Sequence, residues 1–191
     1  MNQSNTLFFK LITVIIKYMN IATKSGDDGY TDIIGEQHLP KNHPLIECLG
    51  TIDELNAFLG DAKAALGVSS EEEGNRCLRE IISEIQKNLI KLMGVIAGMP
   101  VPFGGMDESR LDSLIKELES KMPPFASFAI PGVNPVSAKL HIARTVCRRV
   151  ERCMVGLGLA SETKSVVIPY INRLSDLLFL LAQKEAADRH N

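Results

Sequence analysis

The stretch Leu140-His-Ile-Ala-Arg-Thr-Val-Cys-Arg-Arg-Val-Glu-Arg-Cys-Met154 decides how this sequence folds. Its apolar and charged residues recur at the helical period, so they fall on two adjacent stripes of one helix. The apolar stripe consists of Ala143, Cys147, Val150 and Met154. The charged stripe beside it consists of Arg144, Arg148, Glu151 and Arg152. The stretch therefore predicts an amphipathic helix whose buried seam runs next to a row of charges.

The charged stripe has two interpretations. Charges beside a buried seam are costly to desolvate unless something compensates them, and a polyanion would do so because guanidinium groups bind phosphate oxygens two at a time. In the other interpretation the stripe is a solvated face, with a weakly stabilising Arg148–Glu151 ion pair along the helix. This helix alone favours the solvated face, and the rest of the chain reverses that preference.

Four more segments repeat apolar residues at the helical period and are joined by mostly short loops. They run from about Leu45 to Gly67, from Ser70 to Gly98, from Asp107 to Lys121, and from the region of Pro169 towards the C-terminus. Ser70-Glu-Glu-Glu73 matches a capping box that would open the second of these helices. Because of Pro169, the last helix either begins near Ile168 or is kinked there. No segment shows sustained strand alternation, so we expect an all-α, ferritin-like bundle of five up-and-down helices.

The segment from Ile21 to Pro44 has no helical period and contains several glycines and prolines, so we expect a loop. A structureless segment of ~20 residues in a compact domain is usually functional. The glycines, lysine and hydroxyl groups of Thr23-Lys-Ser-Gly-Asp-Asp-Gly-Tyr-Thr31 could hold a phosphate. The residue orders of a P-loop and of an EF-hand are both missing. Alone, this segment is equally well explained as a plain turn.

The composition limits the remaining possibilities. A chain of 191 residues with 45% hydrophobic residues fits one globular domain. A net charge of −2 and the lack of tryptophan argue against a nucleic-acid binder. The four cysteines form no Cys-x-x-Cys pair, which favours reduced thiols in a cytoplasmic protein, and the scattered histidines lack metal-ligand spacing.

The first 18 residues differ from the rest of the chain. Their apolar run, Leu7 to Ile16, is too short for a membrane span and contains a lysine. We expect residues 1–18 to be a disordered extension or a start assigned too early, with the domain covering 19–191. A membrane or targeting role for them is the less favoured alternative.

Two further polar groups lie on other predicted helices. Asp53 and Glu54 are either a solvated acidic pair or, in the case of Asp53, a partner that orients one arginine of the 140–154 helix. Asn172 and Asp176 are four residues apart and therefore share one helix face. Asn172 could contact a nucleotide there or simply bond a neighbouring helix.

Taken together, four blocks in order are far more specific than any one of them. The blocks are Thr23-Lys-Ser-Gly-Asp-Asp-Gly29, Gly50-Thr-Ile-Asp-Glu-Leu-Asn56, Ala143-Arg-Thr-Val-Cys-Arg-Arg-Val-Glu-Arg152 and Tyr170-Ile-Asn-Arg-Leu-Ser-Asp-Leu-Leu-Phe179. With them, the chain from Ile21 to about Lys184 resembles the PduO-type ATP:cob(I)alamin adenosyltransferases.

The resemblance implies a homotrimer with active sites between subunits, which transfers the 5′-deoxyadenosyl group of ATP to cob(I)alamin and releases triphosphate. It implies an ATP site made of Thr23, Lys24, Ser25, Gly26, Thr31, Asp32, Lys41, Arg148, Arg149, Glu151, Arg152 and Asn172. It gives catalytic roles to Arg148, Arg144 and Asp53, the last two paired across the subunit boundary. Phe128 would cap the lower face of the corrin ring. Mg²⁺ would be held mainly by the ATP phosphates near Glu151.

The partners implied are a flavoprotein that reduces cob(II)alamin and a cobalamin-dependent enzyme, without nucleic acid or membrane. An alternative is an escort protein that binds ATP and adenosylcobalamin and delivers the cofactor to such an enzyme. A third possibility is a degenerate nucleotide-binding bundle with only a structural function, against which Arg148, Glu151 and Asn172 argue.

Overall fold

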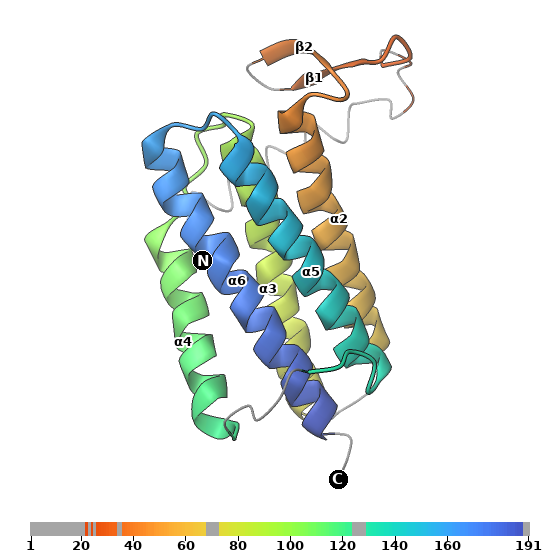
Figure 1. Ribbon diagram of the computed structural model, residues 1–191, viewed down its shortest axis with the longest axis vertical. Helices are drawn as coiled ribbons and strands as arrows, with labels where there is room; N and C mark the ends of the chain where they lie inside the picture. Colours follow the sequence, from red (N-terminus) through yellow and green to blue (C-terminus); the bar gives the residue numbers. More distant parts are fainter. Residues whose placement is uncertain are drawn as a thin grey trace.

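The structure is a computed structural model that describes residues 22, 24, 26–33, 36–67, 73–123 and 129–188. These residues form five helices in one bundle, with a small two-stranded sheet at one end (Figure 1). The helices are α2 (Pro44–Ala65), α3 (Glu73–Ile96), α4 (Gly105–Lys121), α5 (Pro135–Gly156) and α6 (Ser161–Asp188). The strands are β1 (Tyr30–Ile33) and β2 (Glu36–Pro40). The predicted helical bundle is confirmed.

The centre of the bundle is the packing of α5 against α6. In Figure 1 these helices lie side by side, with α4 on the outer side of α6, and α2 packs on α5 and α3. All four residues of the predicted apolar stripe of α5 are 0% exposed. They meet a fully buried row of α6 made of Ile171, Leu174, Leu177 and Leu178. Burying one such aliphatic side chain contributes about 1.5–3 kcal/mol, so this seam holds the two helices in a fixed register.

Two helix boundaries differ from the prediction. α4 begins at Gly105, two residues before the expected Asp107, and α6 begins at Ser161 and runs on through Pro169. Proline removes one helical hydrogen bond, which normally ends or bends a helix. Here Val167 and Tyr170, on either side of Pro169, are buried at 0% and 1% exposure, so packing holds both halves of α6 in place. The expectation of a start near Ile168 is therefore wrong.

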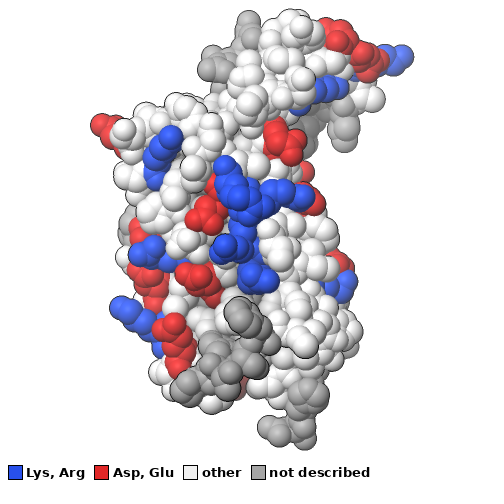
Figure 2. All heavy atoms as spheres, viewed as in Figure 1, with Lys and Arg blue, Asp and Glu red and all other residues white. Residues whose placement is uncertain are grey.

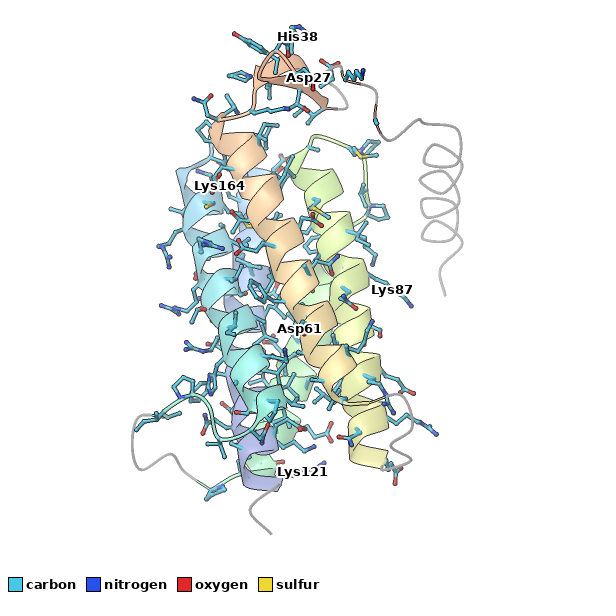
Figure 3. The ribbon with its side chains drawn as sticks, turned by 90° about the vertical axis from the view of Figure 1, so that its right-hand side faces the viewer. Asp27, His38, Asp61, Lys87, Lys121 and Lys164 are labelled. Carbon is cyan, nitrogen blue, oxygen red and sulfur yellow. The ribbon has the colours of Figure 1, made fainter. Side chains whose placement is uncertain are left out.

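The expectation of an unstructured loop up to Pro44 is also wrong, because β1 and β2 form an antiparallel hairpin. Tyr30 lies opposite Pro40, and the pairing shifts by an irregularity between Thr31 and Ile33. Strands of four and five residues with a shifted register give no clear alternation in the sequence. The hairpin lies at the end of the bundle where α2 begins, as the labelled Asp27 and His38 show in Figure 3, and Lys121 lies at the opposite end.

Several predictions fall outside the described residues. These are the extension 1–18, the phosphate-loop residues Thr23 and Ser25, the capping box from Ser70, and Phe128. Within the described part, α6 is the one helix long and apolar enough to cross a membrane, but 56% of its most apolar window is buried inside the bundle. That burial fits the core helix of a bundle.

Candidate functional site

The predicted charged stripe lies on the face that α5 shares with α6. Basic side chains gather in the middle of this face, with acidic side chains beside them (Figure 2). Asn172 of α6 donates a hydrogen bond from Nδ2 to Oε1 of Glu151 at 3.0 Å. Arg152 donates from Nη1 to the backbone oxygen of Arg148 at 2.9 Å. The structure thus brings four predicted site residues of α5 and α6 together. Arg148 and Glu151 do not form the ion pair with each other that the solvated-face interpretation included.

A cavity of about 300 Å³ opens next to Arg148, towards the C-terminal half of α6. It is lined by Glu119, Arg144, Arg148, Ser175, Asp176, Phe179 and Leu180. Glu119 comes from α4, the arginines from α5 and the rest from α6. Arg148 therefore stands between the Glu151–Asn172 pair on one side and a cavity with a partly apolar wall on the other. A ligand held by Glu151 and Asn172 and a second ligand in the cavity would both reach this guanidinium group.

The charges of the cavity are two arginines and two carboxylates. Neighbouring side chains partly shield the Asp176 carboxyl from water, which raises its pKa, while Arg148 and Arg173 oppose this effect. Nε of Arg144 is buried and finds no hydrogen-bond partner among the described residues. A buried donor without an acceptor costs roughly 1–3 kcal/mol, so this nitrogen is a candidate for a bond to a ligand or a second subunit.

The acidic pair of α2 divides between two roles. Arg149 donates from Nη2 to Oε2 of Glu54, an ion pair that joins α5 to α2. Glu54 nevertheless stays exposed, as the solvated-pair interpretation expects. Asp53 is exposed, and within the described part of one chain it does not pair with Arg144. Their predicted contact across a subunit boundary stays a prediction.

The turn before β1 is closed by a lysine. Nζ of Lys41 donates a hydrogen bond to the backbone oxygen of Gly26 at 2.6 Å, and the backbone N–H of Lys41 donates to Gly29 at 2.9 Å. A Cβ atom on Gly26 would lie 2.9 Å from Nζ of Lys41 and 3.2 Å from the backbone oxygen of Tyr30, closer than side chains normally come. Lys24 is exposed and has a left-handed backbone with φ of 60°. The structure thus places three predicted phosphate-binding residues around one tight turn.

The other two predicted residues of this segment lie within the hairpin. Thr31 pairs with Leu39 in the sheet. Oδ1 of Asp32 accepts a hydrogen bond from the backbone N–H of His38 at 3.0 Å and lies 3.2 Å from the ring Nδ1. These hydrogen bonds from His38 lower the pKa of Asp32. Asp32 therefore stabilises the left-handed backbone of His38 within β2, whose φ is 66°, and sequence reasoning did not find that role.

The hairpin and the arginine cluster remain separate in one chain. No hydrogen bond or ion pair between described residues joins the turn at Gly26 and Lys41 to Arg148, Arg149 or Arg152. A ligand that contacts both groups would therefore join two parts of the site that no polar contact between described residues links.

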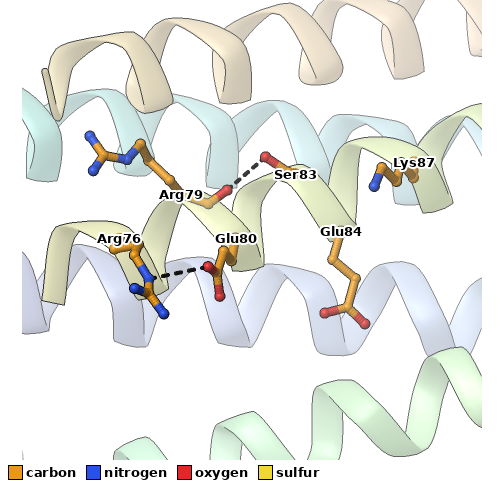
Figure 4. A pocket seen from close by; sticks show the side chains of 6 residues that line it. All are labelled: Arg76, Arg79, Glu80, Ser83, Glu84 and Lys87. Carbon is orange, nitrogen blue, oxygen red and sulfur yellow. Dashed lines mark hydrogen bonds and ion pairs between the residues drawn. The ribbon is translucent and has the colours of Figure 1, made fainter. Parts of the chain in front are cut away.

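The described surface has a second hollow, of about 390 Å³, along one face of α3 (Figure 4). It is lined by Arg76, Arg79, Glu80, Ser83, Glu84 and Lys87. Its opposite charges partly neutralise one another, as in the Arg76–Glu80 pair at 3.4 Å. A shallow groove on one helix with nearly balanced charge has no convergent chemistry, so the α5–α6 cavity is the better candidate although it is smaller.

The geometry agrees with the comparison to known proteins. A family model described as cobalamin adenosyltransferase matches residues 21–185. The chain belongs to the cobalamin adenosyltransferase family. It is 36% identical over 179 residues to the corrinoid adenosyltransferase PduO of Salmonella typhimurium. This alignment covers 90% of this chain and 51% of the Salmonella protein. It is 35% identical to a corrinoid adenosyltransferase of Bacillus subtilis, with 86% of each chain covered.

Solved structures give the same assignment. A variant PduO-type ATP:corrinoid adenosyltransferase from Lactobacillus reuteri, solved with ATP, superimposes with a TM-score of 0.77 at 30% identity and covers 89% of this chain and 96% of its own. Another variant of that enzyme, solved with cobalamin and ATP, gives a TM-score of 0.77 at 29% identity, with 90% and 93% covered. The chain spans about half the length of the Salmonella relative.

Proposed function

We propose that this protein transfers the 5′-deoxyadenosyl group of ATP to cob(I)alamin or a related corrinoid, forming adenosylcobalamin and triphosphate. The observation that carries the proposal is the position of Arg148 between the Glu151–Asn172 pair and a partly apolar cavity, in a chain of this family. The relatives solved with ATP and with cobalamin support both substrates.

The ATP would be bound from two sides. Arg148, Glu151, Arg152 and Asn172 would bind it from α5 and α6, and Arg149 would reach it if it leaves Glu54. Lys24, Gly26 and Lys41 would hold the triphosphate at the turn, together with Thr23, Ser25, Thr31 and Asp32. The tight approach of Lys41 to Gly26 supports this role, because it leaves backbone and ammonium donors without an intervening side chain.

The reaction needs electrostatic help more than proton transfer. The reduced cobalt of the corrinoid substrate would attack the 5′ carbon of ATP with an electron pair and form the cobalt–carbon bond. The carbon–oxygen bond would break, and triphosphate would leave with that bond's electrons. The nucleophile carries no proton to remove, so the protein requires no general base. Its tasks are alignment of the two substrates and stabilisation of charge on the leaving group, for which Arg148 is placed between them.

Mg²⁺ fits this site as a companion of the nucleotide. Mg²⁺ commonly keeps several waters and binds one or two carboxylates together with substrate phosphates. Glu151 offers one carboxylate oxygen to Asn172, and its second oxygen could contact the ion or its waters. Within the described residues, no group of three His, Cys, Asp or Glu side chains could hold a metal ion without a nucleotide. When bound, Mg²⁺ would neutralise phosphate charge.

The corrinoid would approach from the side of the cavity. The cavity is much smaller than a corrinoid, so it would receive one edge or face only, against Phe179 and Leu180. Phe128 precedes the described segment that leads into α5, and we propose that it caps the lower corrin face. An apolar cap would displace the lower axial ligand, and loss of that donor makes cob(II)alamin easier to reduce.

We further propose a homotrimer in the cytoplasm, served by a flavoprotein reductase and supplying a cobalamin-dependent enzyme. The unpartnered Nε of Arg144 and the exposed Asp53 support a site shared between subunits. The four free cysteines support a reducing compartment.

The deciding experiment is an anaerobic assay of the purified chain with chemically reduced cobalamin, ATP and Mg²⁺. The corrinoid spectrum and the phosphate products are followed together. We expect a light-sensitive alkylcobalamin and free triphosphate. Binding of both substrates without conversion would replace the enzyme by the escort function, and failure to bind ATP would leave only the family's fold.

A further inference from the structure

Helix α4 is attached to the bundle mainly through α6. It is rich in charged residues, and its deeply buried apolar side chains are Leu111 and Leu114, at 3% and 7% exposure. Its first turn is also held by Asp107, whose Oδ1 lies 3.4 Å from Nζ of the buried Lys91 of α3. Ile115 and Leu118 also pack against the core but are only partly buried, so polar contacts contribute to the exact position of this helix.

The main polar contact between α4 and α6 is made by Arg173. Nε of Arg173 lies 2.8 Å from Oδ1 of Asp112 and 3.2 Å from Oε1 of Glu108. The two acids are four residues apart, so one guanidinium group bridges successive turns of α4. The side chains of Arg173, Glu108 and Asp112 are only 36%, 28% and 43% exposed. Partial burial and two partners make this bridge stronger than an ordinary surface ion pair.

The bridge and the cavity lie in the same register of the two helices. α4 and α6 run in the same direction, from the hairpin end of the bundle towards the opposite end (Figure 1). Asp112 is level with Arg173, and seven residues further along each helix Glu119 and Leu180 both line the cavity. Seven helical residues span about 10.5 Å on both helices. A shift of α4 along α6 would therefore move Glu119 relative to the arginines of α5.

Among the described residues that line the cavity, Glu119 is the one that α4 supplies. It lines the hollow together with Arg144 and Arg148, and its charge acts on Asp176, whose pKa it helps to raise. With α4 in place, the carboxylates of Glu119 and Asp176 balance the two arginines of the cavity. If α4 moves away, Glu119 leaves the cavity, which then carries a net positive charge and is open on one side.

We propose that Arg173 is a positioning residue: by bridging Glu108 and Asp112 it holds α4 in the register that places Glu119 opposite Arg144 and Arg148. This inference rests on the proposed adenosyl transfer, because it assigns the cavity to the corrinoid side of the site. Arg173 touches neither substrate: it acts through α4, and its charge also opposes the rise in the pKa of Asp176. Its loss changes the cavity, while Glu151 and Asn172 stay in place on α5 and α6.

The test compares Arg173→Gln with Arg110→Gln in the full chain. Arg110 is a matched control because it also ties α4 to a neighbour, Glu84 of α3, but through an exposed pair at 3.6 Å. For Arg173→Gln we expect the KM for the corrinoid to rise roughly 3- to 30-fold while the KM for ATP changes less than about twofold. For Arg110→Gln, both constants stay within about twofold of the wild type.

A double-mutant cycle separates positioning from general destabilisation. If Arg173 acts through Glu119, then Arg173→Gln adds little to the corrinoid KM in a Glu119→Gln background, whereas independent effects would multiply. If Arg173→Gln does not give folded protein, Asp112→Asn, which removes one of the two acceptors, is used in the same cycle. An unchanged corrinoid KM, equal changes in both constants, or multiplied effects in the cycle would overturn the inference with the proposed function intact. A wild-type chain that makes no adenosylcobalamin would overturn both.

Discussion

Replacement of Arg148 by lysine separates the geometry of this side chain from its charge. Arg148 is exposed and donates no hydrogen bond from its guanidinium group within the described residues, so the folded chain loses little in Arg148→Lys. Its positive charge still opposes the rise in the pKa of Asp176. What lysine cannot reproduce is a pair of parallel hydrogen bonds to phosphate oxygens. The variant therefore isolates the contribution of the guanidinium fork to the transition state.

The size of the effect follows from the loss of one charged hydrogen bond. Such a bond contributes about 1.5–3 kcal/mol, and about 1.4 kcal/mol corresponds to a factor of ten in rate, so turnover should fall roughly 10- to 150-fold. The assay is anaerobic conversion of reduced cobalamin, with kcat and KM measured for both substrates and the melting temperature measured in parallel. Arg76→Lys, on the exposed face of α3, serves as the matched control. Wild-type kcat in Arg148→Lys would refute the reasoning, and so would a loss of activity that only follows a lower melting temperature.

Three further predictions concern stability and the thiols. Burial and Arg144 hold the pKa of His141 below its usual 6.5, so the unfolded chain binds this proton more readily than the folded chain. The contribution of His141 to stability is therefore complete above pH 6.5 and is lost as the pH falls below it. Between pH 7.5 and 5, the urea midpoint of His141→Gln should fall less than the urea midpoint of the wild type. Leu174→Ala, at a fully buried position of α6, should lose about 2–5 kcal/mol of unfolding free energy, whereas the exposed Val155→Ala should change it by less than about 0.5 kcal/mol in the same denaturation experiment. Burial raises the pKa of Cys48 to about 12 and also raises the pKa of Cys147. Thiol labelling followed by mass spectrometry should therefore modify the exposed Cys77 first, and Cys48 and Cys147 only when the chain unfolds. Early labelling of Cys147 would contradict its place in the core.

The helices could be predicted because their sequence signal is local and repeated. α5, from Pro135 to Gly156, contains the whole predicted stretch from Leu140 to Met154. It starts earlier because Pro135 follows the capping residue Asn134, which accepts a hydrogen bond from Ser137 at 2.9 Å. The hairpin could not be predicted, because its register depends on the contact between Asp32 and His38 six residues later. The course of α6 through Pro169 could not be predicted either, because burial on both sides of the proline decides it.

The candidate site also has a part that the sequence predicts and a part that it does not. Arg148, Glu151 and Asn172 were found because they stand in specific blocks, and the structure brings the last two within hydrogen-bonding distance. Glu119 has no such block, and its relation to Arg148 depends on the register of α4, which a contact between Arg173 and Asp112 sets. Contacts between helices far apart in the sequence leave no local pattern, so this part of the site required the structure.

The separation of the turn at Lys41 from the arginines of α5 leads to a last prediction about assembly. If one chain contributes the turn and another contributes Arg148, then Lys41→Ala and Arg148→Ala damage different halves of each shared site. In the proposed trimer, a shared site is intact when its turn comes from an Arg148→Ala chain and its α5 from a Lys41→Ala chain. Each cyclic trimer that contains both variants has one such boundary, so the purified mixed trimers should regain about one third of the wild-type activity. A site formed within one chain would instead stay damaged in every subunit. Two affinity tags purified in sequence select the mixed trimers, and each variant alone gives the background. Mixed trimers that show no activity above that background would exclude a shared site.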